Sequence, residues 1–212
     1  MTALPRTLAP SLLLFALLYG GMVTLAGVLG AKQVALGPLA VEAGIFPFLT
    51  LIGIGSGIAE LHGKAIADRM VRFGFVPLAT AMLLSLFVIA LPTDPGMYEP
   101  AKQAFAIVLG QSWRMMLAGI VAYGVSATLN VWIFDRLRRG AAGFAALRGF
   151  VASALSQVVD TLLFITISFY GVRPIWQLMA GQMLAKVVLS AVMVPAIVWI
   201  VVTVGRKLDA AA

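Results

Sequence analysis

The sequence predicts an all-α integral membrane protein with six transmembrane helices, because its composition is strongly apolar and six of its segments are long enough to cross a bilayer. Of the 212 residues, 62% are hydrophobic and 11% are charged, and the mean hydropathy is +1.05. Soluble domains carry about 25% charged residues, so this chain has too few polar side chains to cover a water-facing surface. Lipid must face much of it, and we expect one transmembrane domain over residues 1–212.

Six segments provide the roughly 20 apolar residues that a helix needs to cross the hydrocarbon core. The first begins after Arg6, and a basic residue followed by an apolar run is also the arrangement of a signal peptide. This apolar run is too long for a signal sequence and contains no A-x-A cleavage site, so we expect a retained helix. The second is short and rich in glycine, and tilt or burial among its neighbours would accommodate it. The predicted spans are residues 9–31, 44–60, 73–91, 115–134, 149–170 and 179–204.

The connection between the first two spans, "KQVALGPLAVEAG", predicts a short β-hairpin. Valine-containing apolar runs lie on either side of Gly37 and Pro38, and valine favours strands. Gly-Pro is nevertheless a poor two-residue hairpin turn. Lys32 and Glu42 border the hairpin, where simple solvation would account for both charges.

The longest connection runs from Pro92 to Trp113 and has signals of its own. It opens with "PTDPG", which is typical of a turn. Residues 101–109 then predict a short helix lying at the membrane interface. The sequence therefore predicts a structured external connection between the third and fourth spans.

The net charge of +7 predicts the orientation in the membrane, because basic residues gather on the cytoplasmic side. No nucleic-acid-binding motif accompanies the charge, so we expect no nucleic-acid partner. Lys186 lies inside a span, and the remaining lysines and arginines divide unequally between the two ends of the bundle. One end has Lys32, Lys102, Arg114 and Arg173; the other has Arg6, Lys64, Arg69, Arg72, Arg136, Arg138, Arg139, Arg148, Arg206 and Lys207. This imbalance predicts that both termini are cytoplasmic.

The fifth span contains the stretch "SALSQVVDTLLFIT", in which Asp160 is the only charge of the span. A charge at the bilayer centre costs about 2.5–3.5 kcal/mol on insertion scales, so this carboxylate should face the interior of the bundle. At 100° per residue the neighbouring polar groups share an arc of roughly 100° with it. That stripe either binds a ligand or ion, or joins helices by hydrogen bonds. Its members are Ser153, Ser156, Gln157, Asp160 and, below them, Phe164.

The sixth span has a matching polar face, because Gln182 and Lys186 stand one helical turn apart. Lys186 is too deep in the span to extend easily to the membrane surface. We expect it to form a buried ion pair with Asp160. Buried pairs stabilise little compared with apolar packing, and two interpretations remain: the pair is purely structural, or it also touches substrate.

The fourth span repeats the pattern at Tyr123, Ser126 and Asn130, which recur three and four residues apart and share one face. This face lines the same cavity as Asp160 or bonds to neighbouring helices. Arg114 begins the span beside Trp113, which is typical of an interface anchor and also of a residue at the mouth of a pocket. Both interpretations stay open.

The second span presents Gly53, Ser56, Gly57 and Glu60 on one side. The Gly53-x-x-x-Gly57 pattern allows a second helix to approach closely, either within the chain or across a homodimer. Glu60 ends the span near His62, the single histidine, for which a surface position at the membrane boundary is a simpler explanation than a proton relay.

No pattern in the sequence indicates an enzyme. There is no nucleophile with an adjacent base and no phosphate-binding loop, and one histidine without cysteine makes a metal cluster implausible. We therefore expect no catalytic residues, no metal and no other cofactor. A polar cavity inside a small bundle instead favours transport or capture of a small molecule.

Four motifs, taken in their order and spacing, resemble the queuosine precursor transporter family, also called the vitamin uptake transporter family. They are "ELHGK", "SWRMMLAGIVAY", "SALSQVVDTLLF" and "KVVLSAVMVP", and the similarity runs from about Gly20 to Pro195. The resemblance implies a multi-pass bacterial inner-membrane protein that takes up 7-cyano-7-deazaguanine or 7-aminomethyl-7-deazaguanine for the tRNA nucleoside queuosine. The family also resembles substrate-capture subunits that need a separate ATPase module, and a non-transporting membrane interaction subunit is a further alternative.

The resemblance also implies which residues touch substrate. This chain departs from the family at two positions, with Ser56 where an acid is common and Gly27 where an asparagine is common. By motif, the carried-over residues are Glu60, Arg114, Gln157, Asp160 and Lys186.

The chemistry of the polar residues is compatible with a purine-like ligand. A carboxylate accepts the neighbouring ring N–H and amino group of a guanine-like edge in a bidentate arrangement. An amide can meet the carbonyl and ring nitrogens, and an aromatic ring such as Phe164, Tyr123 or Trp132 can stack on the base. The predicted substrate-binding residues are Asp160, Gln157, Lys186, Asn130, Arg114, Glu60, Ser153, Tyr123 and Phe164.

Overall fold

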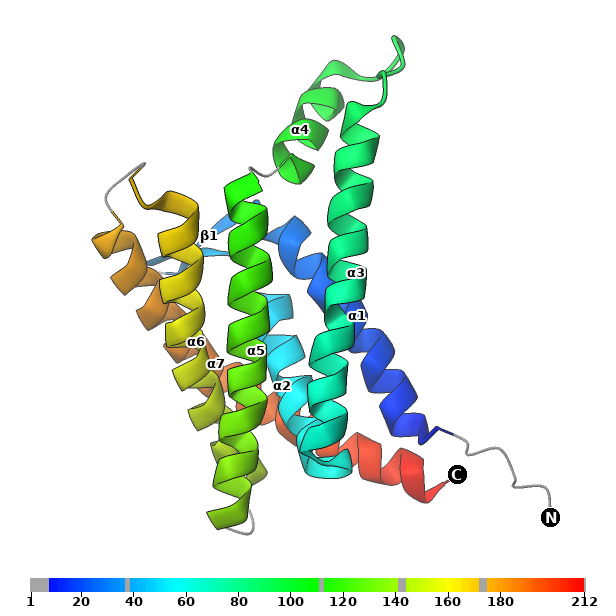
Figure 1. Cartoon of the computed structure of the whole chain (residues 1–212), viewed down its shortest axis with the longest axis vertical. Helices are drawn as coiled ribbons and strands as arrows, with labels where there is room; N and C mark the ends of the chain where they lie inside the picture. The colour runs from blue at the N-terminus through cyan, green and yellow to red at the C-terminus, as the bar shows by residue number, and fades with distance from the viewer. Residues whose placement is uncertain (1–7, 37–38, 111–112, 141–143, 172–174, 212) are drawn as a thin grey trace, which may run out of the picture.

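The structure, a computed structural model, describes residues 8–36, 39–110, 113–140, 144–171 and 175–211. Over these residues it contains seven helices and one two-stranded sheet (Figure 1). Six of the helices, all except α4, are long and apolar enough to cross a membrane, which confirms the predicted fold class. In chain order the elements are α1 (Pro10–Leu29), β1 (Gln33–Leu36), β2 (Leu39–Glu42), α2 (Ile45–His62), α3 (Lys64–Ala90), α4 (Glu99–Leu109), α5 (Trp113–Gly140), α6 (Ala145–Phe169) and α7 (Trp176–Ala210).

Several helices extend beyond the predicted spans. The third was expected to begin at Phe73 but begins at Lys64, the fourth continues past Phe134 to Gly140, and the sixth continues to Ala210. Hydropathy reports the part of a helix that lies in hydrocarbon, whereas backbone hydrogen bonding continues through charged turns in water. The additional turns are the charged ones, so the helices are longer than the apolar segments that predict them.

The central helix is α2, which packs against α1, α3, α5, α6 and α7 and has most of its residues buried. Its glycines meet α7 at very short range. A Cβ atom on Gly53 would lie 2.6 Å from Cγ2 of Ile197, and one on Gly57 would lie 2.4 Å from Cγ1 of Val201. The close approach that the glycine pattern allows therefore occurs within the chain. A homodimer stays a prediction, and this pattern does not lie on an outer face to support it.

The predicted hairpin and the helix after the third span are both present. Strands β1 and β2 are antiparallel, with Gln33 opposite Glu42, and the Ala43 N–H donates to the Lys32 carbonyl at 2.7 Å. The turn at positions 37–38 lies outside the described residues. Helix α4 begins at Glu99, slightly earlier than expected, and packs against α3. The hairpin and α4 lie at the same end of the bundle (Figure 1).

The opposite end of the bundle brings together the first residues of α1 and the last of α2 and α7. Ser11 Oγ donates to Asp209 Oδ2 at 2.7 Å and lies 2.7 Å from His62 Nε2, and the Ser11 N–H donates to Asp209 Oδ1 at 3.1 Å. These bonds join three helix ends (Figure 1). They give His62 a structural partner in Ser11, and its position at a membrane boundary stays a prediction.

Candidate functional site

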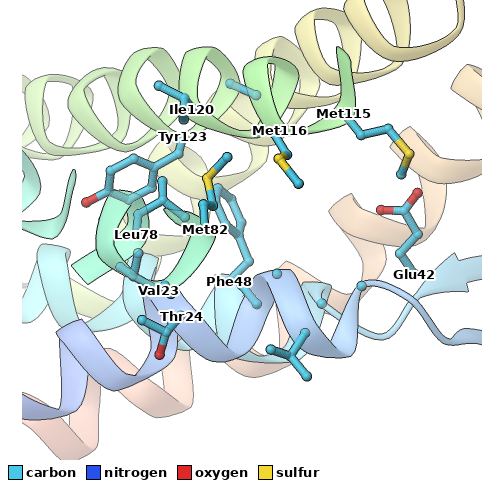
Figure 2. Close-up of a pocket in the computed structure, with 18 of the residues that line it drawn as sticks. Val23, Thr24, Glu42, Phe48, Leu78, Met82, Met115, Met116, Ile120 and Tyr123 are labelled. Carbon is cyan, nitrogen blue, oxygen red and sulfur yellow. The ribbon is translucent and has the colours of Figure 1, made fainter. Parts of the chain in front are cut away.

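A partly enclosed cavity of about 200 Å³ lies in the half of the bundle nearer the hairpin and α4. Its walls come from the second half of α1, the end of β2, the first half of α2, the second half of α3, the end of α4 and the first half of α5. Helix α6 contributes Asp160 and Phe164, and α7 contributes Lys186. The cavity is therefore formed by segments from almost the whole chain (Figure 2).

The predicted ion pair is present on the wall of this cavity. Lys186 Nζ donates to Asp160 Oδ2 at 2.9 Å, and Ser126 Oγ donates to Asp160 Oδ1 at 3.0 Å. A carboxylate offers about four acceptor positions and an ammonium three donors, so these bonds leave capacity on both groups. Asp160 is 6% exposed and Lys186 9%, and both line the cavity.

Two of the predicted aromatic residues, Tyr123 and Phe164, also line the cavity. The hydroxyl of Tyr123 donates to the Val71 carbonyl at 2.8 Å and lies 3.2 Å from the hydroxyl of Tyr19. Its ring packs edge-on against Phe75, with centroids 4.9 Å apart. Tyr123 is therefore held in one orientation by α1 and α3, with its polar group engaged by protein.

The sequence missed a carboxylate, an aromatic ring and the sulfur-containing side chains of the cavity wall. Glu42, Phe48, Met115 and Met116 all line it, and Figure 2 shows the side chains of Glu42 and Met115 close together at the end opposite Tyr123. Glu42 was expected to be solvated, but it is half-buried. The hairpin packs against α7 through β2, the strand that ends at Glu42, and nothing local in the sequence indicates that contact.

The polar stripe of α6 faces the interior, as its helical period predicts, since Ser153, Ser156, Gln157 and Asp160 are all buried. Only Asp160 of this group reaches the cavity. Ser153 stands seven residues earlier, about 10 Å away along the axis, towards the end where the chain terminates. Ser153 Oγ and both amide atoms of Gln157 have no hydrogen-bond partner among the described residues. Substrate contact by these two residues stays a prediction.

Asn130 lies on the predicted face of α5 but meets α2 instead of the cavity. Its Nδ2 donates to Ser56 Oγ at 3.0 Å and to the Ile52 carbonyl at 3.4 Å. These bonds are of the kind that joins helices in membranes. Trp132, considered above for stacking, is 54% exposed on the outer surface, so the structure does not bring it to the site.

Arg114 lies at the same end of the bundle as the cavity but outside its wall. Its Nε donates to the Ile167 carbonyl at 3.2 Å, and its Nη2 donates to the Tyr170 carbonyl at 3.1 Å. The last carbonyls of a helix lack intrahelical partners, and a cation there also interacts favourably with the helix dipole. In this structure Arg114 joins the start of α5 to the end of α6.

Glu60 lies at the far end of α2 and pairs with a buried arginine. Arg148 Nη2 donates to Glu60 Oε2 at 2.9 Å, and the Arg148 guanidinium lies over the ring of Phe134, 5.3 Å from its centroid. The pair ties α2 to the start of α6, far from the cavity. Arg148 was assigned above to the basic end of the bundle, but its side chain is buried there, with 6% exposure.

A second hollow, of about 440 Å³, lies between α1 and α3. Its described lining is apolar apart from Tyr19 and Arg69, and it includes Leu8 and Phe73, which are 67% and 70% exposed on the outer surface. A binding site usually combines apolar walls with a few convergent polar groups. The cavity beside Asp160 has that character, whereas this hollow has the character of a lipid-facing groove.

Comparison with known proteins agrees with these features. Residues 42–200 match the family described as "Putative vitamin uptake transporter". The chain is also 26% identical over 169 residues to a Bacillus subtilis (strain 168) protein named "Probable queuosine precursor transporter", with 77% of this chain and 73% of that protein covered. No solved structure matches. The family match takes in α2 to α6 and most of α7, including Glu42, Asp160 and Lys186. The chain, a multi-pass membrane protein, therefore belongs to the vitamin uptake transporter family.

Proposed function

We propose that this protein is a bacterial inner-membrane uptake transporter for queuosine precursors, and that it holds them in the cavity beside Asp160 and Lys186. The observation that carries the proposal is an ion pair on the wall of a cavity within the membrane-spanning helices. Such a pair stabilises less than apolar side chains would, so its presence there favours a role in recognition. The name of the Bacillus subtilis relative supports this choice of substrate.

The ion pair is suited to the edge of a guanine-like base. That edge presents an amino group, a ring N–H and a carbonyl oxygen in a row. The Asp160 carboxylate would accept from the two donors, and the Lys186 ammonium beside it would donate to the carbonyl. Ser126, which donates to Asp160 at 3.0 Å, would hold the carboxylate in orientation. The two charges together thus recognise three neighbouring atoms of the ligand.

The remaining cavity wall suits a flat base without a sugar. Phe48 and Phe164 line it, and stacking on an aromatic ring contributes about 1–3 kcal/mol per base in other proteins. The methionines beside them are flexible enough to adapt to a ligand. A cavity of about 200 Å³ is smaller than the roughly 300–1,000 Å³ of drug-sized sites, which favours a free base over a nucleoside.

The charge distribution supports an orientation with both termini in the cytoplasm. The cavity would then lie towards the outside, where a precursor is captured. Because the chain has no cysteine, single cysteines test this directly. We expect a membrane-impermeant thiol reagent to label Gln103→Cys on α4 in intact cells, and Lys207→Cys only after permeabilisation. Both side chains are exposed, and the reverse labelling pattern would overturn the orientation.

The transport function is tested in a strain that cannot make queuosine precursors but retains the later steps of the pathway. Expression of this protein is expected to restore queuosine in tRNA when 7-cyano- or 7-aminomethyl-7-deazaguanine is supplied at low concentration, whereas an empty vector is not. Absence of restoration with either base, in cells whose membranes contain the folded protein, would contradict the proposal. Uptake lost on ATP depletion in vesicles with ion gradients held constant would instead indicate a capture subunit that needs an ATPase partner.

A further inference from the structure

We infer that the second hollow, between α1 and α3, is a binding site for one anionic phospholipid, with the lipid phosphate on Arg69 and an acyl chain along the groove. The site lies apart from the cavity beside Asp160, and the inference does not depend on which substrate that cavity takes. It is carried by the lining of the groove, by its length, and by the position and surroundings of Arg69.

The groove is apolar and opens to the surrounding membrane. Its volume is about 440 Å³, and its described lining comes from Leu8, α1 and α3 only. Leu13 and Phe73 line it and are 53% and 70% exposed, so one side of the groove faces lipid. Both helices begin at the end of the bundle where α7 ends (Figure 1). The groove therefore runs from that end towards the middle of the membrane.

The length of the groove matches one leaflet of the bilayer. On α3 its lining runs from Arg69 to Pro77, and on α1 from Leu12 to Gly20. At 1.5 Å per residue, each of these stretches is about 12 Å long. The hydrocarbon of one leaflet is about 15 Å deep, which is half of the bilayer core. Because the apolar span of α3 is predicted to begin at Phe73, Arg69 lies about one turn outside it, at the level of the lipid headgroups.

Arg69 is the only charged residue among the described residues that line the groove. Its guanidinium makes no hydrogen bond or ion pair with another described residue. The neighbouring carboxylate, Asp68, pairs with Lys64, and Arg72 Nε donates to the Asp68 carbonyl at 3.3 Å. An arginine binds a phosphate through two parallel hydrogen bonds, and a basic pocket between helices at the cytoplasmic side is typical of an anionic headgroup site. Arg69 is thus available for a lipid phosphate.

The inner part of the groove is bordered by a pair of tyrosines and has room for an acyl chain. Tyr19 lines the groove, and its hydroxyl lies 3.2 Å from that of Tyr123, which lines the cavity beside Asp160. These two side chains lie between the lipid groove and that cavity. A Cβ atom on Gly20 would meet only Pro77 Cγ, at 3.8 Å, which is an ordinary contact. A larger side chain at Gly20 would therefore occupy the space that we assign to the acyl chain.

The test measures lipid binding to the purified full-length protein in detergent, by native mass spectrometry and by melting temperature. The probes are phosphatidylglycerol and phosphatidylcholine with the same dioleoyl chains. We expect one phosphatidylglycerol to bind at least about fivefold more tightly than phosphatidylcholine, because the choline cation offsets the phosphate charge that Arg69 attracts. Binding should raise the melting temperature by mass action. Glycerol 3-phosphate, which has the phosphate without an acyl chain, should not raise it.

Two pairs of variants test the two parts of the site. Arg69→Gln should weaken phosphatidylglycerol binding at least about fivefold. Its matched control, Arg72→Gln, changes an exposed arginine of α3 that lies outside the groove and should stay within about twofold of the native affinity. Gly20→Leu should weaken both lipids by filling the groove. Its control is Gly21→Leu, at a position outside the lining with no neighbour within 4 Å of a Cβ atom, and it should weaken neither.

Four results would each overturn the inference. Equal affinity of the native protein for the two lipids would do so without requiring any variant to fold. Equal losses in Arg69→Gln and Arg72→Gln would show that positive charge attracts lipid without a defined site. Unchanged lipid binding by Gly20→Leu would place the acyl chain elsewhere. A dimer in detergent that Gly20→Leu converts to a monomer would assign the groove to a second copy of this chain.

Discussion

Replacing Asp160 with alanine is expected to abolish uptake of deazaguanine bases and to lower the free energy of unfolding by about 3–5 kcal/mol. The substitution leaves the Lys186 ammonium, which is 9% exposed, buried without the carboxylate that lies 2.9 Å from it. It also removes the carboxylate that we propose accepts hydrogen bonds from the ligand. The measurements are the melting temperature in detergent and uptake into cells, normalised to the amount of protein in the membrane.

The double variant Asp160→Asn, Lys186→Met separates the two effects. It removes both charges together, and replacing a whole buried pair is often neutral or stabilising. We therefore expect a melting temperature close to that of the native protein, with uptake still absent. If this double variant transported normally, the pair would be purely structural, and Asp160 would not recognise substrate.

Replacing Gly57 with valine is expected to prevent the close packing of α2 against α7 and to reduce the yield of folded protein sharply. Even a bare Cβ atom at this position would lie 2.4 Å from Cγ1 and 2.8 Å from Cβ of Val201, so valine forces α7 to move. Overpacking a well-packed interior typically costs about 1–3 kcal/mol, and α2 is the helix that most of the others contact. The measurement is the melting temperature and the fraction of monodisperse protein after extraction.

Gly21→Val is the matched control for this substitution. Gly21 also lies within a membrane-spanning helix, but a Cβ atom there would have no neighbour within 4 Å. It should therefore melt close to the native protein. If Gly57→Val melted at the same temperature as Gly21→Val and only changed the oligomeric state, the glycine pattern would belong to an interface between chains, contrary to the contacts described.

The helical period predicted which residues face inward, but it contained no information on where along the bundle axis they lie relative to the cavity. Ser153, Gln157 and Asp160 share one face and are all buried, yet only Asp160 lines the cavity. On α5, Tyr123 lines the same cavity, whereas Asn130, about two turns further, bonds to Ser56. A rotation of 100° per residue specifies direction around the axis, whereas the position of a cavity along it depends on how the helices tilt and stagger.

The sequence by itself determined that the protein spans the membrane six times, which faces of its helices point inward, and that Asp160 and Lys186 are each other's natural partners. These conclusions follow locally, because placing a charge or an exposed backbone group in lipid is costly at any position in any fold. Only the tertiary structure decided which polar groups meet in one cavity. Glu42, Asp160 and Lys186 come from a hairpin and two helices, and their meeting depends on the packing of the whole bundle, which no single segment specifies.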